Sequence, residues 1–189
     1  MLPKVIIVTA PSGAGKTTIV KHLLSQFPKL AFSVSATTRT PRLGEIDGID
    51  YYFISVEEFN QRVLNKEFVE YEEVYHQTYY GTLMDEVKRL WKENLVVVFD
   101  VDVKGSITLK KNFGESALSL FIKPPSTQIL DQRLRNRATD ELSKIEERIA
   151  KAHYELEFEE YFDRTIINDN LSVALEEAVI AVQDFINKK

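Results

Sequence analysis

The feature that most constrains the fold of this 189-residue chain is a β-branched run, a glycine-containing turn and a helical segment in direct succession near the N-terminus. Residues 4–9 are dominated by Val and Ile, as is typical of a strand buried on both faces. Apolar residues at helical spacing follow over residues 16–27, and Pro28 ends the pattern. A buried strand that passes through a tight turn into a helix predicts an α/β fold built on a parallel sheet.

Further strand and helix candidates alternate along the chain. Residues 96–100, 118–122 and 165–168 are short apolar runs, and each is followed by a helical segment. The last helix carries one apolar stripe, formed by Leu171, Leu175, Val179, Val182 and Ile186. This alternation implies right-handed βαβ crossovers and a parallel sheet covered by helices on both faces.

Two segments depart from the alternation. Between about residues 33 and 83 we predict short, more alternating strands, at residues 51–54, 67–72 and 74–80. A capping box at residues 55–58 would begin a helix among them. From Arg133 to about residue 154 the chain is charged, with four arginines in sixteen residues, and resembles a lid. The expected parts are a core of residues 1–32, 84–125 and 155–189, a small mixed α/β insert of residues 33–83, and an arginine-rich helical lid of residues 126–154.

The composition excludes several kinds of site. There is no cysteine, so disulfides and thiolate metal sites are excluded, and three scattered histidines disfavour a zinc site. The longest apolar runs fall far below the roughly 18 residues of a membrane span. The N-terminus lacks the architecture of a secretory signal, so we expect a cytoplasmic protein. A net charge of −5 disfavours general nucleic-acid binding, and no obligate protein partner is expected.

A phosphate-binding loop is the strongest motif. Residues 10–18, Ala-Pro-Ser-Gly-Ala-Gly-Lys-Thr-Thr, match the P-loop pattern except that Ala10 replaces its first Gly. Two glycines let the backbone curl its amides toward phosphate oxygens, and the helix N-terminus adds free N–H groups. The loop residues expected to bind the phosphates are Ser12, Gly13, Ala14, Gly15, Lys16, Thr17 and Thr18. Lys16 is predicted to reach the β- and γ-phosphates and Thr17 to ligate Mg²⁺, whereas a merely connecting turn would not explain their spacing.

Two carboxylates stand where the strand at residues 96–100 ends. Asp100 ends the run and Asp102 follows two residues later. The carboxyl edge of a central parallel strand faces the ligand crevice, so both are candidate substrate-binding residues and Asp100 a candidate Mg²⁺ ligand. Alone, a strand-ending aspartate would more simply be a turn residue. Beside a P-loop, the pair indicates an enzyme that transfers or hydrolyses phosphate.

A second polar cluster lies in the predicted insert. Arg39 and Arg42 are three residues apart with hydroxyl side chains around them, which suits a phosphate monoester. Tyr51, Glu70 and Tyr80 follow downstream. Taken alone, the arginines could form a solvated face and the tyrosines could pack in the core with satisfied hydroxyls.

With these motifs in order, the chain resembles the guanylate kinase family nearly end to end. The resemblance rests on the phosphate loop, Ser-Ala-Thr-Thr-Arg-Thr-Pro-Arg at residues 35–42, Tyr-Tyr-Gly-Thr at 79–82, Asp-Val-Asp at 100–102, Pro-Pro-Ser at 124–126 and Ile-Asn-Asp at 167–169. It implies transfer of the γ-phosphoryl group of MgATP to GMP, and to dGMP, giving ADP and the nucleoside diphosphate in purine nucleotide metabolism.

The resemblance also implies roles for individual residues. The residues expected to hold the GMP phosphate are Arg39, Arg42, Tyr51 and Tyr80, and those expected to recognise guanine are Ser35, Glu70 and Thr82. Arg133, Arg137 and Arg148 match the lid arginines, which join Lys16 and Arg39 as catalytic cations. Asn168 is expected near the base of ATP. The chain departs from the family pattern at Asn136 and Ala138, where glycines are usual, and at residues 103–105.

Two other functions stay open. A related kinase that phosphorylates another acceptor, such as ribose 1,5-bisphosphate, would not need Glu70 together with Ser35 and Thr82. A non-catalytic guanylate-kinase-like module that binds phosphopeptides would typically lack a working phosphate loop, whereas Lys16 and Thr17 are present here.

Overall fold

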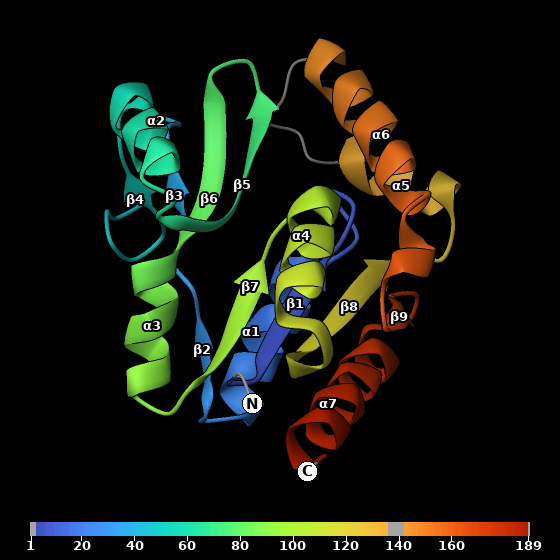
Figure 1. The fold of residues 1–189 in the computed structure, drawn as a ribbon. Helices are drawn as coiled ribbons and strands as arrows, with labels where there is room; N and C mark the ends of the chain where they lie inside the picture. Colours follow the sequence, from blue (N-terminus) through green and yellow to red (C-terminus); the bar gives the residue numbers. More distant parts are fainter. Residues whose placement is uncertain (1–2, 136–141, 189) are drawn as a thin grey trace.

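A five-stranded parallel sheet is the centre of the computed structural model, which describes residues 3–135 and 142–188 (Figure 1). Its strand order is β2-β7-β1-β8-β9. The strands are β1 (Val5–Thr9), β2 (Leu30–Phe32), β7 (Val96–Asp100), β8 (Ala117–Lys123) and β9 (Arg164–Ile167). Four were predicted to within one residue at each end. β2 was missed because three residues are too few to show a period.

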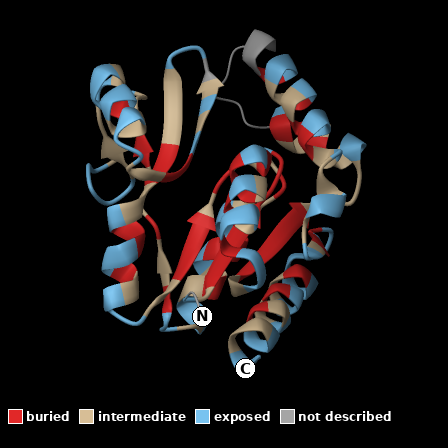
Figure 2. Ribbon diagram, in the orientation of Figure 1, coloured by how far each residue is buried: buried red, intermediate tan, exposed pale blue. Residues whose placement is uncertain are grey.

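Helices cover both faces of this sheet, as predicted. Successive side chains of a strand point to opposite faces, so Ile6 and Val8 belong to one hydrophobic cluster while Val5 and Ile7 belong to another. The first cluster lies under α1 (Lys16–Gln26) and α7 (Leu171–Asn187), and the second under α3 (Met84–Lys92) and α4 (Val103–Phe113). Figure 2 shows the central strands buried between these layers. The predicted fold class is therefore confirmed.

The buried face of α7 lies slightly away from the predicted stripe. Ala174, Ala178 and Val182 are fully buried, whereas Leu171 is 44% exposed. The other predicted positions, Leu175, Val179 and Ile186, pack at the flanks of the cluster. The prediction followed the larger apolar side chains, but small side chains form the line of contact because they allow α7 to approach the sheet and α1 closely.

A second, mixed sheet of order β4-β3-β6-β5 lies beside the core (Figure 1). Its strands are β3 (Ala36–Thr37), β4 (Tyr52–Phe53), β5 (Phe68–Tyr75) and β6 (Thr78–Leu83). The helix α2 (Val56–Leu64) covers it through Phe59, whose ring stacks on Phe68 and Tyr79. Ser55 caps α2 by accepting a hydrogen bond of 3.1 Å from the Glu58 amide, so the predicted helix start is confirmed.

The hairpin of this second sheet turns later than predicted. Val74 was expected to begin a new strand, but it lies inside β5, and the turn falls at His76 and Gln77. Gln77 adopts a left-handed φ of 56°, which the tight turn requires. The resulting register places Glu70 of β5 directly opposite Thr82 of β6.

Two helices on the other side of the core form a small unit of their own (Figure 1). α5 (Thr127–Arg135) and α6 (Leu142–Leu156) share a hydrophobic cluster made of Leu130, Leu134, Ile145, Ile149 and Ala152. α6 continues across the predicted lid boundary at residue 154. Short 3₁₀ turns at Gly114–Ser116 and Glu159–Tyr161 complete the elements. Within the described ranges, no helix is long and apolar enough to cross a bilayer.

The close approach of α7 gives a stability prediction. Ala178→Leu adds three carbons at a fully buried position, so it should lower the free energy of unfolding by about 1–3 kcal/mol. Val173→Leu changes a side chain of the same helix that is 51% exposed, and it should stay within about 0.5 kcal/mol of wild type. Urea denaturation of both variants measures the difference, and equal stabilities would contradict this packing.

Candidate active site

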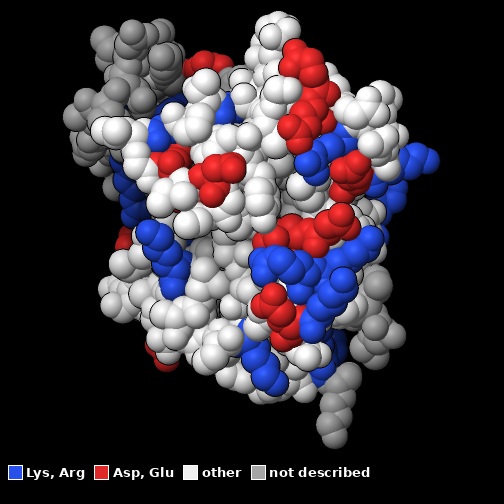
Figure 3. Space-filling model, turned by 90° about the vertical axis from the view of Figure 1, so that its left-hand side faces the viewer, with Lys and Arg blue, Asp and Glu red and all other residues white. Residues whose placement is uncertain are grey.

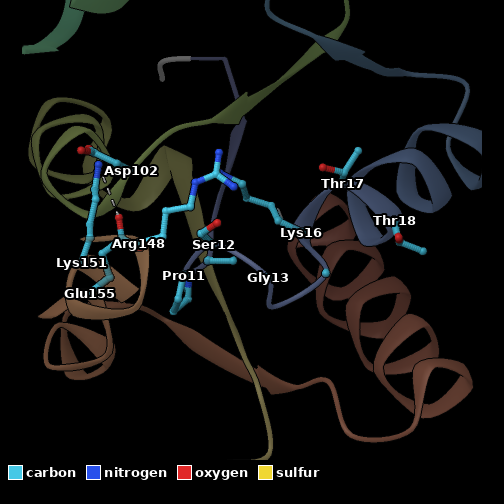
Figure 4. Close-up of a pocket in the computed structure, with 12 residues that line it drawn as sticks. Pro11, Ser12, Gly13, Lys16, Thr17, Thr18, Asp102, Arg148, Lys151 and Glu155 are labelled. Atoms are coloured by element: carbon cyan, nitrogen blue, oxygen red, sulfur yellow. Dashed lines mark ion pairs between the residues drawn. The ribbon is translucent and has the colours of Figure 1, made fainter. Parts of the chain in front are cut away.

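The loop between β1 and α1 curls around a cavity. Gly13 and Gly15 have φ angles of 88° and 99°, a left-handed conformation that favours glycine. Gly15 is also the N-cap of α1, and the Ala14 amide donates to the Pro11 carbonyl over 3.1 Å. The loop residues that line this cavity of about 400 Å³ include Ser12, Gly13, Gly15, Lys16, Thr17 and Thr18 (Figure 4). We call it the donor cavity.

Two residues predicted at the ATP site, Ala14 in the loop and Asn168 near the base, do not line the donor cavity and instead support the loop from behind. Ala14 is fully buried in the core beneath α1. Asn168 is 7% exposed, and its side-chain amide donates to the Ala14 carbonyl over 2.7 Å. A Cβ atom on Gly15 would overlap that amide. The structure thus places Asn168 as a brace of the loop.

Three side chains of α6 line the donor cavity from the opposite side (Figure 4). Arg148, Lys151 and Glu155 are spaced three and four residues apart, which puts them on one helix face. Glu155 is 6% exposed and lines the cavity together with Ser12 of the loop. Burial raises its pKa to about 6, against the opposing charges of Lys151 and Lys16. Only Arg148 was predicted from the sequence, although helical spacing from it would have indicated the other two.

Arg133, another arginine predicted for the lid, does not line the donor cavity. Arg133, on α5, donates from Nη2 to the backbone carbonyl of Asn168 over 3.1 Å, so it contacts the brace of the loop. Arg137 lies outside the described residues, as do Asn136 and Ala138.

A second cavity, of about 320 Å³, opens beside Lys16 at the carboxyl edge of the core sheet. We call it the acceptor cavity. The predicted substrate residues that line it are Ser35, Arg39, Arg42, Tyr51, Glu70, Tyr80, Asp100 and Asp102. Thr82 is fully buried behind it, with its hydroxyl 3.5 Å from that of Ser35. Lys16, Asp102 and Lys151 line both cavities, so the two spaces meet at these side chains.

Arg39 is held rigidly at the acceptor cavity. Its two terminal nitrogens each donate to the Glu45 carboxylate over 2.8 Å, and Nε donates to the Tyr80 hydroxyl over 3.1 Å. The Tyr51 ring lies 5.3 Å from the guanidinium, within cation–π range. The hydrogen bonds from Arg39 hold the pKa of Glu45 at about 2, well below its ordinary value. Glu45 also accepts from the Arg42 amide over 2.7 Å, a role that no sequence motif indicated.

Glu70 is a buried carboxylate that is only partly satisfied. It is 6% exposed, and its Oε1 atom has no hydrogen-bond partner among the described residues. Burial raises its pKa to about 7, while hydrogen bonds from Thr82 act in the opposite direction. Gly105 leaves room for it, since a Cβ there would stand 3.0 Å from Glu70 Oε2. An unsatisfied buried acceptor on a cavity wall suits a ligand that brings its own N–H donors.

The two aspartates at the end of β7 have different surroundings. Asp100 forms an ion pair with Lys16. Asp102 caps α4, because its Oδ1 atom accepts from the Gly105 amide over 2.9 Å. Among the described residues, no three acidic or histidine side chains cluster as a metal site. Mg²⁺ bound through substrate phosphates and water needs only one or two protein oxygens, and the Thr17 hydroxyl and Asp100 carboxylate fit that donor set.

Away from the cavities, opposite charges are interspersed on the face formed by α2 and α3 (Figure 3). Arg62 pairs with Glu58 over 2.8 Å on α2. Arg89 pairs with Glu86 and Glu93 over 3.0 and 3.1 Å on α3. On this face the positive charges are therefore largely balanced by nearby carboxylates.

A parallel sheet whose first strand enters such a loop defines a P-loop protein, and a second cavity that opens beside the loop lysine is the arrangement of a nucleoside monophosphate kinase. The family model "Guanylate kinase" matches residues 2–189. The chain belongs to the guanylate kinase family.

Individual relatives agree over almost the whole chain. It is 50% identical to a guanylate kinase of Bacteroides thetaiotaomicron over 189 residues, which cover all of this chain and 93% of the relative. It is 47% identical to a guanylate kinase of Porphyromonas gingivalis over 188 residues, or 99% and 100% of the two chains. The crystal structure of guanylate kinase from Anaplasma phagocytophilum superposes with a TM-score of 0.80 at 26% identity, covering all of this chain and 88% of the other.

The raised pKa of Glu70 predicts a pH-dependent stability. The folded state binds this proton more tightly than the unfolded state, so the free energy of unfolding should fall as the pH rises from about 4.5 through about 7. Glu70→Gln cannot titrate, so its stability relative to wild type should increase by on the order of 1–3 kcal/mol between pH 5 and 8.

Urea denaturation at the two pH values measures this change. Glu115→Gln, at an exposed carboxylate, is the matched control and should show a much smaller change. The burial argument would be wrong if both variants shifted equally.

Proposed function

We propose that the donor cavity binds ATP and the acceptor cavity binds GMP, so that the chain transfers the γ-phosphoryl group of ATP to GMP and releases ADP and GDP. Membership of the guanylate kinase family supports this reaction. The observation that carries the assignment is that Lys16 lines both cavities while Glu70 stands buried and partly unsatisfied in the second. dGMP carries the same base and phosphate, so we propose it as a further acceptor.

Recognition of guanine would depend on Glu70. A carboxylate accepts from both the N1–H and the exocyclic amine of guanine. Adenine has an acceptor at N1 and no amine at C2, so it would leave the buried carboxylate unpaired. A site that hydrogen-bonds a substrate group can reject an analogue lacking it by about 10⁴–10⁵. Thr82 and Ser35, which lie beside Glu70, would orient it and complete the polar wall.

The residues proposed to bind the acceptor phosphate are Arg39, Arg42, Tyr51 and Tyr80. Arg39 already lies in fixed geometry through Glu45 and Tyr80, so little side-chain entropy would be lost when it binds an anion. Because four of the five N–H groups of Arg39 are already engaged, it would offer charge and one N–H donor, and the guanidinium fork of Arg42 would match the oxygens of a phosphate monoester.

The transfer itself needs positioning and positive charge. The GMP phosphate is largely ionised near neutral pH, with a second pKa of about 6, so no general base is required. Lys16 and Arg148 lie on the wall of the donor cavity, where they can stabilise the charge on the oxygens of the moving phosphoryl group. We extend this role to Arg133 and Arg137 as lid arginines. Thr17 and Asp100 are proposed to hold Mg²⁺, which when bound would neutralise phosphate charge.

Binding of ATP, binding of GMP and stabilisation of the moving phosphoryl group are proposed to belong to three parts of the chain. We propose a core of residues 1–32, 84–125 and 155–189, a GMP-binding insert of residues 33–83 and a lid of residues 126–154. The second sheet and α2 fall within the insert, and α5 and most of α6 fall within the lid.

An acceptor panel tests the function directly. With MgATP, ADP release should be rapid with GMP and dGMP and near background with AMP, UMP and ribose 1,5-bisphosphate. Glu70→Gln should weaken GMP binding and reduce the ratio of kcat/KM for GMP over AMP by about 10²-fold or more, because it removes the charged acceptor. Preference for ribose 1,5-bisphosphate, or an unchanged GMP to AMP ratio in the variant, would contradict the assignment.

The phosphate loop has its own test. Lys16→Ala should lower kcat by roughly 10²–10³ or more, while GMP binding measured by calorimetry largely survives, since most of the predicted GMP contacts lie between residues 35 and 82, away from the phosphate loop. Lys21→Ala, at an exposed position five residues further along α1, should retain wild-type kcat. Equal activity in the two variants would remove the loop lysine from the mechanism.

A further inference from the structure

Lys151 occupies a place that the functional assignment above does not use. It lines the donor cavity and the acceptor cavity, a property it shares with Lys16 and Asp102. Its side chain is 35% exposed, so it is neither buried in the core nor fully in solvent. A cation at the junction of two nucleotide-sized cavities lies where a phosphoryl group would pass between them.

The position of Lys151 is fixed from both sides of α6. On the packed side, Ile149 and Ala152 belong to the cluster shared with α5. On the cavity side, Glu155 lies one turn further along, with its carboxylate 4.0 Å from the Lys151 ammonium, as the dashed line in Figure 4 shows. Glu155 in turn lines the donor cavity together with Ser12 of the phosphate loop. The lysine thus faces a carboxylate that stands on the wall opposite the loop.

We propose that Lys151 is a further catalytic residue of the transfer reaction and that Glu155 is its positioning residue. The proposal rests on the function given above. In the transfer, the bond from the γ-phosphorus to the bridging oxygen of ADP breaks while a bond to a GMP phosphate oxygen forms, and no proton need move. Negative charge spreads over the three equatorial oxygens on the way. The ammonium of Lys151 contacts those oxygens as a compact point charge.

A purely structural role makes a different prediction. A Lys–Glu pair at spacing i,i+4 contributes only about 0.2–0.5 kcal/mol to a helix, so its removal would barely change either stability or catalysis. A contact made only in the transition state lowers kcat and leaves substrate binding almost unchanged. The split between kcat and KM therefore separates the two roles.

The experiment compares four single variants in the ATP plus GMP assay. Lys151→Met should lower kcat by about 10²-fold, the loss typical of one removed electrostatic donor, with KM for ATP and GMP within about threefold and an unchanged Tm. Lys151→Arg should recover most of kcat. Lys88→Met, which removes an exposed cation on α3, is the matched control and should match wild type.

Glu155→Gln tests the positioning role. It keeps the size and shape of the side chain but removes the charge that faces Lys151, so kcat should fall less than in Lys151→Met. Because Glu155 is proposed to act through Lys151, the double variant should be no slower than Lys151→Met alone.

The outcomes are distinct. If Lys151→Met keeps the kcat of the wild-type enzyme, and the wild-type enzyme phosphorylates GMP, the role of Lys151 is overturned and the proposed function stands. A loss of Tm that parallels the loss of kcat, or additive losses in the double variant, also overturns it. A wild-type enzyme inactive on GMP would instead refute the proposed function.

Discussion

One packing constraint fixes the geometry on which the site depends: no side chain can stand at Gly15. The Asn168 amide occupies that space and donates to the carbonyl of Ala14. Asn168 is itself held at the end of β9, where its backbone amide donates to the Lys123 carbonyl over 2.7 Å. The phosphate loop is therefore tied to the ends of two further strands, β8 and β9. That tie sets where α1 begins, and hence where Lys16 stands.

The parts of the fold that local pattern determines were predictable. Strands of the core sheet are buried on both faces, so each appears in the sequence as an uninterrupted apolar run, and four of the five were found. β2 and β3 have only three and two residues, too few for any period to show, whereas β4 lies within the strand predicted at residues 51–54. The positions of β2 and β3 depend on partners far along the chain, as in the pairing of β3 with both β4 and β6.

The same distinction separates the site residues that the sequence indicated from those it did not. The phosphate loop is contiguous, so its chemistry was visible in one motif. No local motif indicates Glu45, Lys151 or Glu155. They belong to the site only because the fold brings α6 and the loop before β4 to the edge of the core sheet. Even Glu70, which the family resemblance indicated, owes its unsatisfied oxygen to the hairpin register that sets it against Thr82, and the sequence placed that hairpin turn too early.

Concentrating cations at one edge of a sheet has an electrostatic cost that the chain offsets locally. Lys16 pairs with Asp100, Arg39 with Glu45 and Lys151 with Glu155. The first pair also joins α1 to β7, whereas the second lies within the loop between β3 and β4 and the third lies within α6. Because these cations stay partly exposed, their mutual repulsion is screened by water and salt. The side chains shared by the two cavities are Lys16, Lys151 and Asp102, which together carry a formal charge of only +1. A bound anion would therefore be favoured by close contact with the two ammonium groups, and not by a strong positive field over the surface of a chain whose net charge is −5.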